Sequence, residues 1–301
     1  MPRLSVIMPV KNGAATVRRA VRSTLRAMPG DSELLVFDDS SVDGTAQALS
    51  EFGDHRLRVV TDDSVAGVAD GLNALLRRSD SELVARMDAD DVVLPLRFTR
   101  QQSALADGDD AVFSTVVDWY PDRKWIKPNP PLPIGVEAFP FHLLVTNPVS
   151  HPTMMARRSV LDAVGGYRQV PAEDYDLWLR LYLAGARQRR LAMPALLYRM
   201  HPTQVTASAG WRRASWASDV VSETFQDVSE RILGRRFLRL TTLSSLESVS
   251  DAEYERLVTE FQSALERASS RLGRGERRLF LGKLRQRLES ARRLRCSLGT
   301  S

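Results

Sequence analysis

The chain has 301 residues, of which 43% are hydrophobic and 26% charged, and its formal net charge is +5. These values are typical of a globular protein that can bury a sizeable core, as one large domain or as a domain with an appendage. A single cysteine, Cys296, excludes an internal disulfide framework and a cysteine-rich zinc site, and a reducing compartment is expected.

The N-terminal third alternates strand and helix patterns. Apolar runs at 4–8, 33–37, 57–60 and 82–87 are typical of buried strands, and helices are predicted between them at 14–28, 45–52 and 68–78. This alternation predicts a parallel sheet with right-handed crossovers. The sequence carries neither the glycine-rich dinucleotide-binding pattern nor a P-loop, which argues against both of those classes.

Two of the predicted strands lead directly into aspartates. Asp38 and Asp39 follow the second strand, and Asp88, Asp90 and Asp91 follow the fourth. Because parallel strands end at one edge of a sheet, where open α/β folds bind ligands, both sets should share an edge. Packed carboxylates favour a cation between them, and hard oxygen ligands suit Mg²⁺ or Mn²⁺ in contact with a substrate phosphate. The alternative is a solvent-exposed acidic turn in which Asp91 caps the next helix.

The middle of the chain contains one segment of a different kind. Residues 120–140 hold six prolines and Trp125, which predicts a long loop without regular structure, ordered near a substrate. Around it, strands are predicted at 111–117 and 150–155, and helices at 96–106, 159–164 and from 173 onward. Glu173 and Asp174 open the last of these helices, where acids ordinarily serve the helix dipole.

From about residue 211 the chain is rich in helix formers and arginine, and this part is called the tail. Helices are predicted at 220–233, 251–272 and 276–294. About 18 basic against about 12 acidic residues lie from position 204 onward, so the basic excess belongs to the tail and a nucleic-acid-binding catalytic domain is not indicated. Phe280, Leu284, Leu288 and Ala291 form an apolar stripe, which is typical of a packed surface helix, although a basic amphipathic helix can also lie on anionic lipid.

Residues 4 to about 202 resemble the inverting glycosyltransferases of family 2. The matching stretches are, in chain order, Ser5–Pro9 with Asn12, Val36–Thr45, Gly67 with Asn73, Met87–Asp91, His151–Thr153, Gly165–Tyr167, Glu173–Trp178 and Tyr198–His201. Each is weak alone, whereas their order and spacing together are specific. The resemblance implies an α/β GT-A fold, with a mixed, mostly parallel sheet flanked by helices. It also implies a catalytic domain over 1–210, followed by a basic α-helical region over 211–301.

The resemblance implies roles for single residues. Asp174 matches the catalytic base, with Glu173 as the alternative, and the metal site, for Mn²⁺ or Mg²⁺, would use Asp90 and His201. Residues expected to bind the nucleotide sugar are Pro9, Asn12, Asp38, Asp39, Asn73, Asp88 and Arg199. The metal would neutralise charge on the departing diphosphate as a Lewis acid. Two positions depart from the family pattern: Lys11 replaces an aromatic residue, and Ser40 follows the acids in place of glycine.

We therefore predict an inverting, metal-dependent glycosyltransferase that acts in cell-surface polysaccharide, glycolipid or glycoconjugate synthesis. It would move a sugar from a nucleotide-diphosphate sugar, most simply a UDP-sugar, to a saccharide or lipid-linked acceptor. One alternative is a sugar-1-phosphate nucleotidyltransferase, which would need a longer basic loop than Lys11–Gly13. Another is an inactive nucleotide-sugar-binding module, against which the intact aspartates argue.

The expected location follows from the apolar segments. The N-terminus lacks a signal-peptide pattern, and no apolar stretch reaches the roughly 20 residues that span a bilayer. We expect a cytoplasmic protein. Peripheral contact with the cytoplasmic face of the membrane, or homo-oligomerisation through the C-terminal helices, is left open, and no nucleic-acid partner is expected.

Overall fold

The computed structural model describes residues 2–201, 204 and 208–299. The chain falls into two compact units. Unit 1 consists of residues 1–133, 149–169 and 186–202, and unit 2 of residues 134–148, 170–185 and 203–301. Each unit is therefore assembled from several separate segments. The division into domains at residue 210 stays a prediction.

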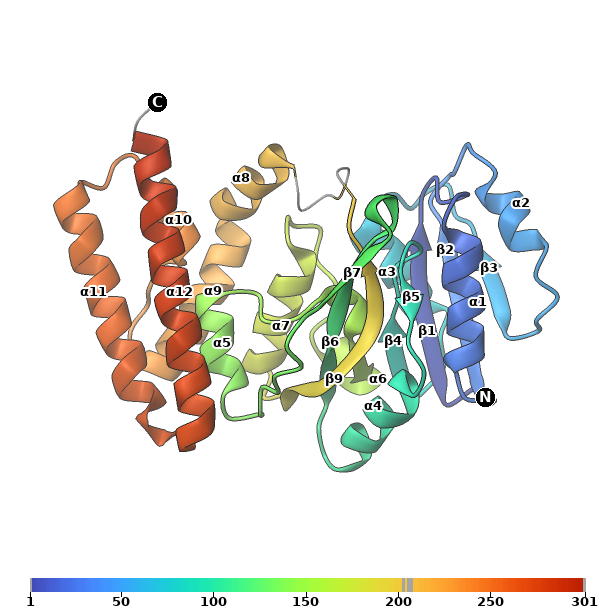
Figure 1. The fold of residues 1–301 in the computed structure, drawn as a ribbon, viewed down its shortest axis with the longest axis horizontal. Coiled ribbons are helices and arrows are strands. Elements are labelled where there is room, and N and C mark those ends of the chain that lie inside the picture. Colours follow the sequence, from blue (N-terminus) through green and yellow to red (C-terminus); the bar gives the residue numbers. More distant parts are fainter. Residues whose placement is uncertain (1, 202–203, 205–207, 300–301) are drawn as a thin grey trace. The chain divides into compact units, whose positions relative to one another are not determined.

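Unit 1 is built on a mixed sheet of nine strands in the order β3-β2-β1-β4-β8-β6-β9-β5, with β7 paired to β6 (Figure 1). The strands are β1 Leu4–Val10, β2 Ser32–Asp38, β3 Leu57–Val60, β4 Leu83–Arg86, β5 Val92–Val93, β6 Ala111–Tyr120, β7 Trp125–Pro128, β8 Met155–Arg157 and β9 Gln188–Arg199. The first four in spatial order are parallel, as predicted, and β8 and β5 join antiparallel to their neighbours.

Helices cover both faces of the parallel part of the sheet. The helices of unit 1 are α1 Val17–Ala27, α2 Thr45–Ser50, α3 Val68–Arg77, α4 Arg97–Ala106 and α6 Arg158–Ala163, with 3₁₀ turns at Pro121–Arg123 and His151–Thr153. Val6 and Met8 of β1 share a buried cluster with Val21 of α1. On the opposite face α3 packs so closely that a Cβ on Gly71 would lie 2.7 Å from the Phe37 ring. Burial on both faces explains why β1 and β2 are nearly continuous apolar runs.

The prediction that residues 120–140 lack regular structure is wrong in part. Trp125–Pro128 forms β7, which pairs antiparallel with the end of β6. The prolines bracket this strand instead of interrupting it, because Pro121 opens a 3₁₀ turn and Pro128 is the last strand residue. Trp125 stacks on Tyr120 across the hairpin, with 5.1 Å between the ring centroids.

Unit 2 is helical. Its helices are α5 Phe139–Val145, α7 Glu173–Leu183, α8 Ala209–Ala217, α9 Asp219–Leu233, α10 Leu240–Ser245, α11 Asp251–Ala268 and α12 Arg274–Gly299. The apolar stripe predicted at 280–291 is buried inside this unit, where the Phe280 ring lies 5.6 Å from that of Phe141 on α5. The stripe is thus a packing surface. Among the described residues, no helix has both the length and the apolar character needed to cross a bilayer.

Candidate functional site

Three neighbouring strands of unit 1 end at the same edge of the sheet. Because β1 runs parallel to β2 and β4, Val10 lies opposite Asp38 and Ile7 lies opposite Arg86. The chain leaves these strands at Lys11, Asp39 and Met87. The two sets of aspartates therefore share one edge, as the sequence indicated.

Asp39 is held at the end of β2 by two donors. Its Oδ2 accepts hydrogen bonds from Lys11 Nζ and from the backbone N–H of Gly67, both at 3.2 Å. Asp38 Oδ1 accepts one from the N–H of Ser41 at 3.2 Å. Ser40 has φ +50, so it adopts the left-handed conformation that glycine would favour. The loop keeps its course without the glycine, and Lys11 contributes a charge where an aromatic ring was expected.

Asn12 ties the loops after β1 and β2 together. Its Oδ1 accepts a hydrogen bond from the N–H of Val42 at 2.9 Å, and its own N–H donates to Ser41 Oγ at 2.8 Å. Pro9 precedes it in β1, half-buried and opposite Phe37. In this structure Asn12 shapes the edge that Pro9 and Asp39 line.

A cluster of carboxylates follows β4. Asp88, Asp90 and Asp91 each place an oxygen within 4.8 Å of the others. Antiparallel pairing of Val92 with Leu197 carries the end of β9 past this cluster. The N–H of Arg199 donates to Asp91 Oδ1 at 2.8 Å, and His201 Nε2 lies 3.1 Å from Asp90 Oδ2.

Burial sets the charge balance of the cluster. Burial raises the pKa of Asp88, the charge of Asp90 adds to this, and the ion pair with Arg86 opposes it. Burial, together with the charges of Asp88 and Asp90, raises the pKa of Asp91 well above its usual range. Asp91 is only 1% exposed and its Oδ2 has no hydrogen-bond partner in the structure. The helix-capping alternative for Asp91 is wrong, because α4 begins only after Leu96.

These residues fit a divalent cation. Three carboxylates and one imidazole supply hard oxygen ligands and a nitrogen, the set that Mn²⁺ and Mg²⁺ accept. The buried, unbonded Oδ2 of Asp91 is the kind of atom that a positive charge nearby would stabilise.

Asn73 lies on α3 in unit 1, and its side-chain amide makes two hydrogen bonds to the backbone of Tyr167. Its Nδ2 donates to the Tyr167 carbonyl at 2.8 Å and its Oδ1 accepts from the Tyr167 N–H at 2.9 Å. The Tyr167 hydroxyl lies 3.0 Å from Nε2 of His151, whose pKa burial lowers well below its usual value. The structure thus gives Asn73 a positioning contact, and its predicted contact with the nucleotide sugar stays a prediction.

The predicted catalytic carboxylates lie in unit 2, in the first turn of α7. The residue before this turn, Ala172, has φ +63. Asp174 Oδ2 accepts a hydrogen bond from Asn147 Nδ2 at 2.7 Å, and its Oδ1 accepts one from the N–H of Tyr175 at 2.7 Å. The Tyr175 hydroxyl donates to the carbonyl of Leu143 at 2.6 Å, and burial raises its pKa to about 12.

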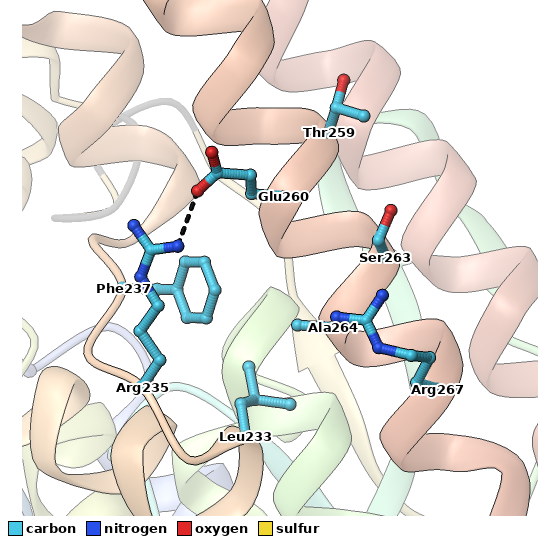
Figure 2. Close-up of a pocket in the computed structure, with 8 residues that line it drawn as sticks. All are labelled: Leu233, Arg235, Phe237, Thr259, Glu260, Ser263, Ala264 and Arg267. Atoms are coloured by element: carbon cyan, nitrogen blue, oxygen red, sulfur yellow. Dashed lines mark hydrogen bonds and ion pairs between the residues drawn. The ribbon is translucent and has the colours of Figure 1, made fainter.

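A pocket elsewhere in unit 2 holds none of the predicted site residues. Figure 2 shows it beside α11, with Arg235 and Glu260 joined at 2.7 Å across it. Its lining residues are Leu233, Arg235, Phe237, Thr259, Glu260, Ser263, Ala264 and Arg267. It contains one carboxylate, already ion-paired, so we do not place the catalytic site there.

Sequence reasoning missed several partners of the site. Arg86 sits in a strand whose residues are all buried, and a charged residue in such a run is a usable signal that a counter-charge lies nearby. Asn147 gave no signal, because its partner Asp174 is 27 residues away and on another element.

Comparisons with known proteins identify the family of the chain. The model of glycosyl transferase family 2 matches residues 5–165 of the chain. The chain belongs to this family. Its enzyme class, a glycosyltransferase, was correctly predicted from the sequence.

Relatives of this family 2 glycosyltransferase include bacterial glycosyltransferases. The putative glycosyltransferase EpsE of Bacillus subtilis is 31% identical over 198 residues, which are 62% of this chain and 69% of EpsE. The Escherichia coli UDP-Glc:alpha-D-GlcNAc-diphosphoundecaprenol beta-1,3-glucosyltransferase WfaP is 23% identical over 212 residues, 69% of this chain and 81% of WfaP.

Solved structures confirm the GT-A fold. TarS of S. aureus, in complex with UDP-GlcNAc, has a TM-score of 0.60 at 18% identity. The aligned region covers 100% of this chain and 92% of the TarS chain. The mannosyltransferase PcManGT of Pyrobaculum calidifontis, in complex with GDP-Man and Mn²⁺, has a TM-score of 0.56 at 17% identity. The aligned region covers 99% of this chain and 85% of the PcManGT chain.

Proposed function

We propose that this glycosyltransferase depends on a divalent cation and transfers its sugar with inversion at the anomeric carbon. The donor is a nucleoside-diphosphate sugar and the acceptor a hydroxyl group. The observation that supports this most is the meeting of Asp88, Asp90, Asp91 and His201 at the sheet edge that also carries Asp39.

In unit 1, Asp90 and His201 would hold Mn²⁺ or Mg²⁺. When bound, the cation supplies charge neutralisation for the departing diphosphate. Asp88, oriented by its ion pair with buried Arg86, accepts hydrogen bonds from the ribose side of the donor. Asp39 accepts a hydrogen bond from the base, on an edge lined by Pro9 and completed by Asp38 and Asn12. Arg199, fixed through its backbone to Asp91, provides a cation for the diphosphate.

In unit 2, Asp174 is the proposed base that takes the proton of the acceptor hydroxyl. It sits in the first turn of α7, where the helix dipole favours an ionised carboxylate. The amide of Asn147 fixes one of its oxygens. Glu173, its neighbour in the same turn, is the alternative base.

The named ligands of relatives suggest the substrates. TarS was solved with UDP-GlcNAc, PcManGT with GDP-Man, and the name of WfaP describes a diphosphoundecaprenol-linked acceptor. We propose a UDP-sugar donor and a saccharide or lipid-linked acceptor, in cell-envelope polysaccharide or glycolipid synthesis at the cytoplasmic face of the membrane.

A screen of nucleotide sugars tests the proposal. The protein is incubated with each donor, with Mn²⁺ or with excess chelator, and nucleoside diphosphate release is measured. We expect release from one class of donor, abolished by chelator and by Asp90→Asn. The anomeric configuration of the product is then read by NMR. Full turnover in chelator overturns the metal assignment, and a product that keeps the donor's configuration overturns inversion.

A further inference from the structure

The charges of α11 and α12 are unevenly distributed along the two helices, which run antiparallel and side by side within unit 2 (Figure 1). Where the start of α11 meets the last turns of α12, arginines and acids match. Arg292 pairs with Glu255 at 2.9 Å, and Arg295 pairs with Asp251 at 3.1 Å. This end is electrically balanced across the two helices.

The other end is not balanced. Between residues 266 and 287 the basic residues are Arg267, Arg271, Arg274, Arg277, Arg278, Lys283, Arg285 and Arg287, and the acids are Glu266 and Glu276. The carboxylate of Glu276 already has a partner, because it accepts a hydrogen bond from the backbone N–H of Gly135 at 3.2 Å. The same helix pair therefore carries its charge excess at the turn between α11 and α12.

The exposed arginines of this turn, Arg267, Arg271, Arg274, Arg278 and Arg285, are called the basic turn. Arg271 lies over the Phe141 ring at 5.0 Å. In the part of the chain that the structure describes, the other four make no ion pair with a carboxylate. Arg274, Arg278 and Arg285 recur on one exposed face of α12, and that face lies beside the buried stripe of Phe280 and Leu284, about 100° away around the helix. Like charges gathered this way repel one another unless an anionic surface lies against them.

We propose that the basic turn docks on an anionic phospholipid surface. Each arginine near such a surface gains favourable energy from the lipid headgroups. Leu279, 39% exposed beside Arg278, offers an apolar side chain to the boundary of the acyl chains. Nucleic acid is the less suitable partner, because the one aromatic residue among 267–285, Phe280, is fully buried and cannot stack on a base.

This inference rests on the proposed function in one respect, namely that a lipid-linked acceptor would lie in the same surface. The sequence suggested that the helix with the apolar stripe at 280–291 can lie on lipid. Because the stripe itself is buried, the side of α12 proposed to face the membrane is the basic one.

Vesicle sedimentation at low salt tests the proposal with a matched pair of variants. Arg274→Glu/Arg278→Glu reverses two charges in the basic turn. Arg212→Glu/Arg213→Glu reverses two exposed charges on α8 of the same unit. The wild type should bind vesicles with about 30% phosphatidylglycerol, not pure phosphatidylcholine, and should dissociate as salt rises. The basic-turn variant should lose at least about twentyfold in partitioning, and the α8 variant less than about threefold.

Several outcomes overturn the inference: no binding by the wild type, equal binding by the basic-turn variant, or an equal loss in the α8 variant. Duplex DNA that binds as tightly as the vesicles, with the same sensitivity to Arg274→Glu/Arg278→Glu, also overturns it in favour of nucleic acid. Release of nucleoside diphosphate in solution separates the two proposals. The basic-turn variant should retain it, whereas a wild type without this activity contradicts the proposed function itself.

Discussion

The side-chain amide of Asn147 donates a hydrogen bond to Asp174 Oδ2 at 2.7 Å, so the loop after α5 holds a carboxylate in the first turn of α7. With Oδ1 bonded to the N–H of Tyr175, both oxygens of Asp174 are fixed in direction. A base must be aimed at the proton it removes, and a misplacement of about 1 Å can cost about a hundredfold in rate.

Asn147→Ala should therefore lower kcat by roughly ten- to a hundredfold and leave the KM for the donor nearly unchanged. Steady-state kinetics check this, and a double-mutant cycle shows whether the effect acts through Asp174. In an Asp174→Asn background Asn147→Ala should change kcat by less than about twofold, and in a Glu173→Gln background it should retain its full effect. Equal effects in both backgrounds would mean that Asn147 is only structural. If Asp174→Asn itself keeps full turnover, the base assignment is wrong.

Asp90 should decide whether a metal and a nucleotide stabilise the protein together. For the wild type, saturating Mn²⁺ with a nucleoside diphosphate should raise Tm by several degrees, because ligands that bind only the folded state stabilise it. Asp90→Asn should abolish the Mn²⁺-dependent part of this shift, and Asp63→Asn, which removes an exposed acid, should keep it. Differential scanning fluorimetry with and without chelator measures both, and an unchanged shift in Asp90→Asn removes the metal from this cluster.

Asp39→Ala should weaken donor binding by roughly ten- to a hundredfold, because a hydrogen bond to a charged group contributes about 1.5–3 kcal/mol. Titration calorimetry gives the affinity. Lys11→Met serves as the stability control, because it removes the ion-pair partner of Asp39 and leaves the carboxylate in place. Lys11 is more than half exposed, and exposed ion pairs contribute at most about 1 kcal/mol to stability. Unchanged donor affinity in Asp39→Ala would place the base of the nucleotide elsewhere.

Asn73→Ala should destabilise the protein by about 2–3 kcal/mol, because it leaves two backbone groups of Tyr167 without their partner. Asn73→Asp keeps the acceptor and loses the donor, so its loss should be intermediate. Urea unfolding measures these values. If Asn73→Ala instead weakens donor binding with unchanged stability, the predicted nucleotide-sugar contact is correct and the positioning role is not its main one.

His151 should make stability depend on pH. Burial, and then the charge of Arg86, holds the pKa of His151 well below its usual value, so it stays neutral in the folded protein. The unfolded chain binds a proton there as pH falls through about 6.5, so stability falls with pH below that point, by up to about 1.4 kcal/mol per pH unit. Between pH 7.5 and 5 the wild type should lose more stability than His151→Gln, which retains a partner for Tyr167. Parallel losses would contradict this.

The sequence predicted the parallel half of the sheet and its acidic edge because β1, β2 and β4 are buried on both faces and read as apolar runs. It did not predict β5, which has two residues and no periodicity, or the first half of β9, where Arg189 and Arg190 are half-exposed. Without β5 and β9 nothing in the pattern brings His201 to Asp90; only the family resemblance did.

The partners of the candidate residues were harder to predict than the residues themselves. In the sequence, Arg86 only interrupts an apolar run. In the structure it forms the ion pair that supplies Asp88 with a buried counter-charge. The hydrogen bonds of Asn147 and Asn73 depend on loops whose course no local pattern determines.

The interleaving of the two units has a consequence for how the chain folds as it is synthesised. Phe141 on α5 packs against Phe280 on α12, and α7 packs against α9, so early segments of unit 2 need late ones to cover them. At a synthesis rate of about 5–20 residues per second, Phe141 waits roughly 7–28 s for Phe280 to emerge. During that interval the apolar faces of α5 and α7 are open to chaperones and to other nascent chains, and unit 2 closes only once α12 has left the ribosome.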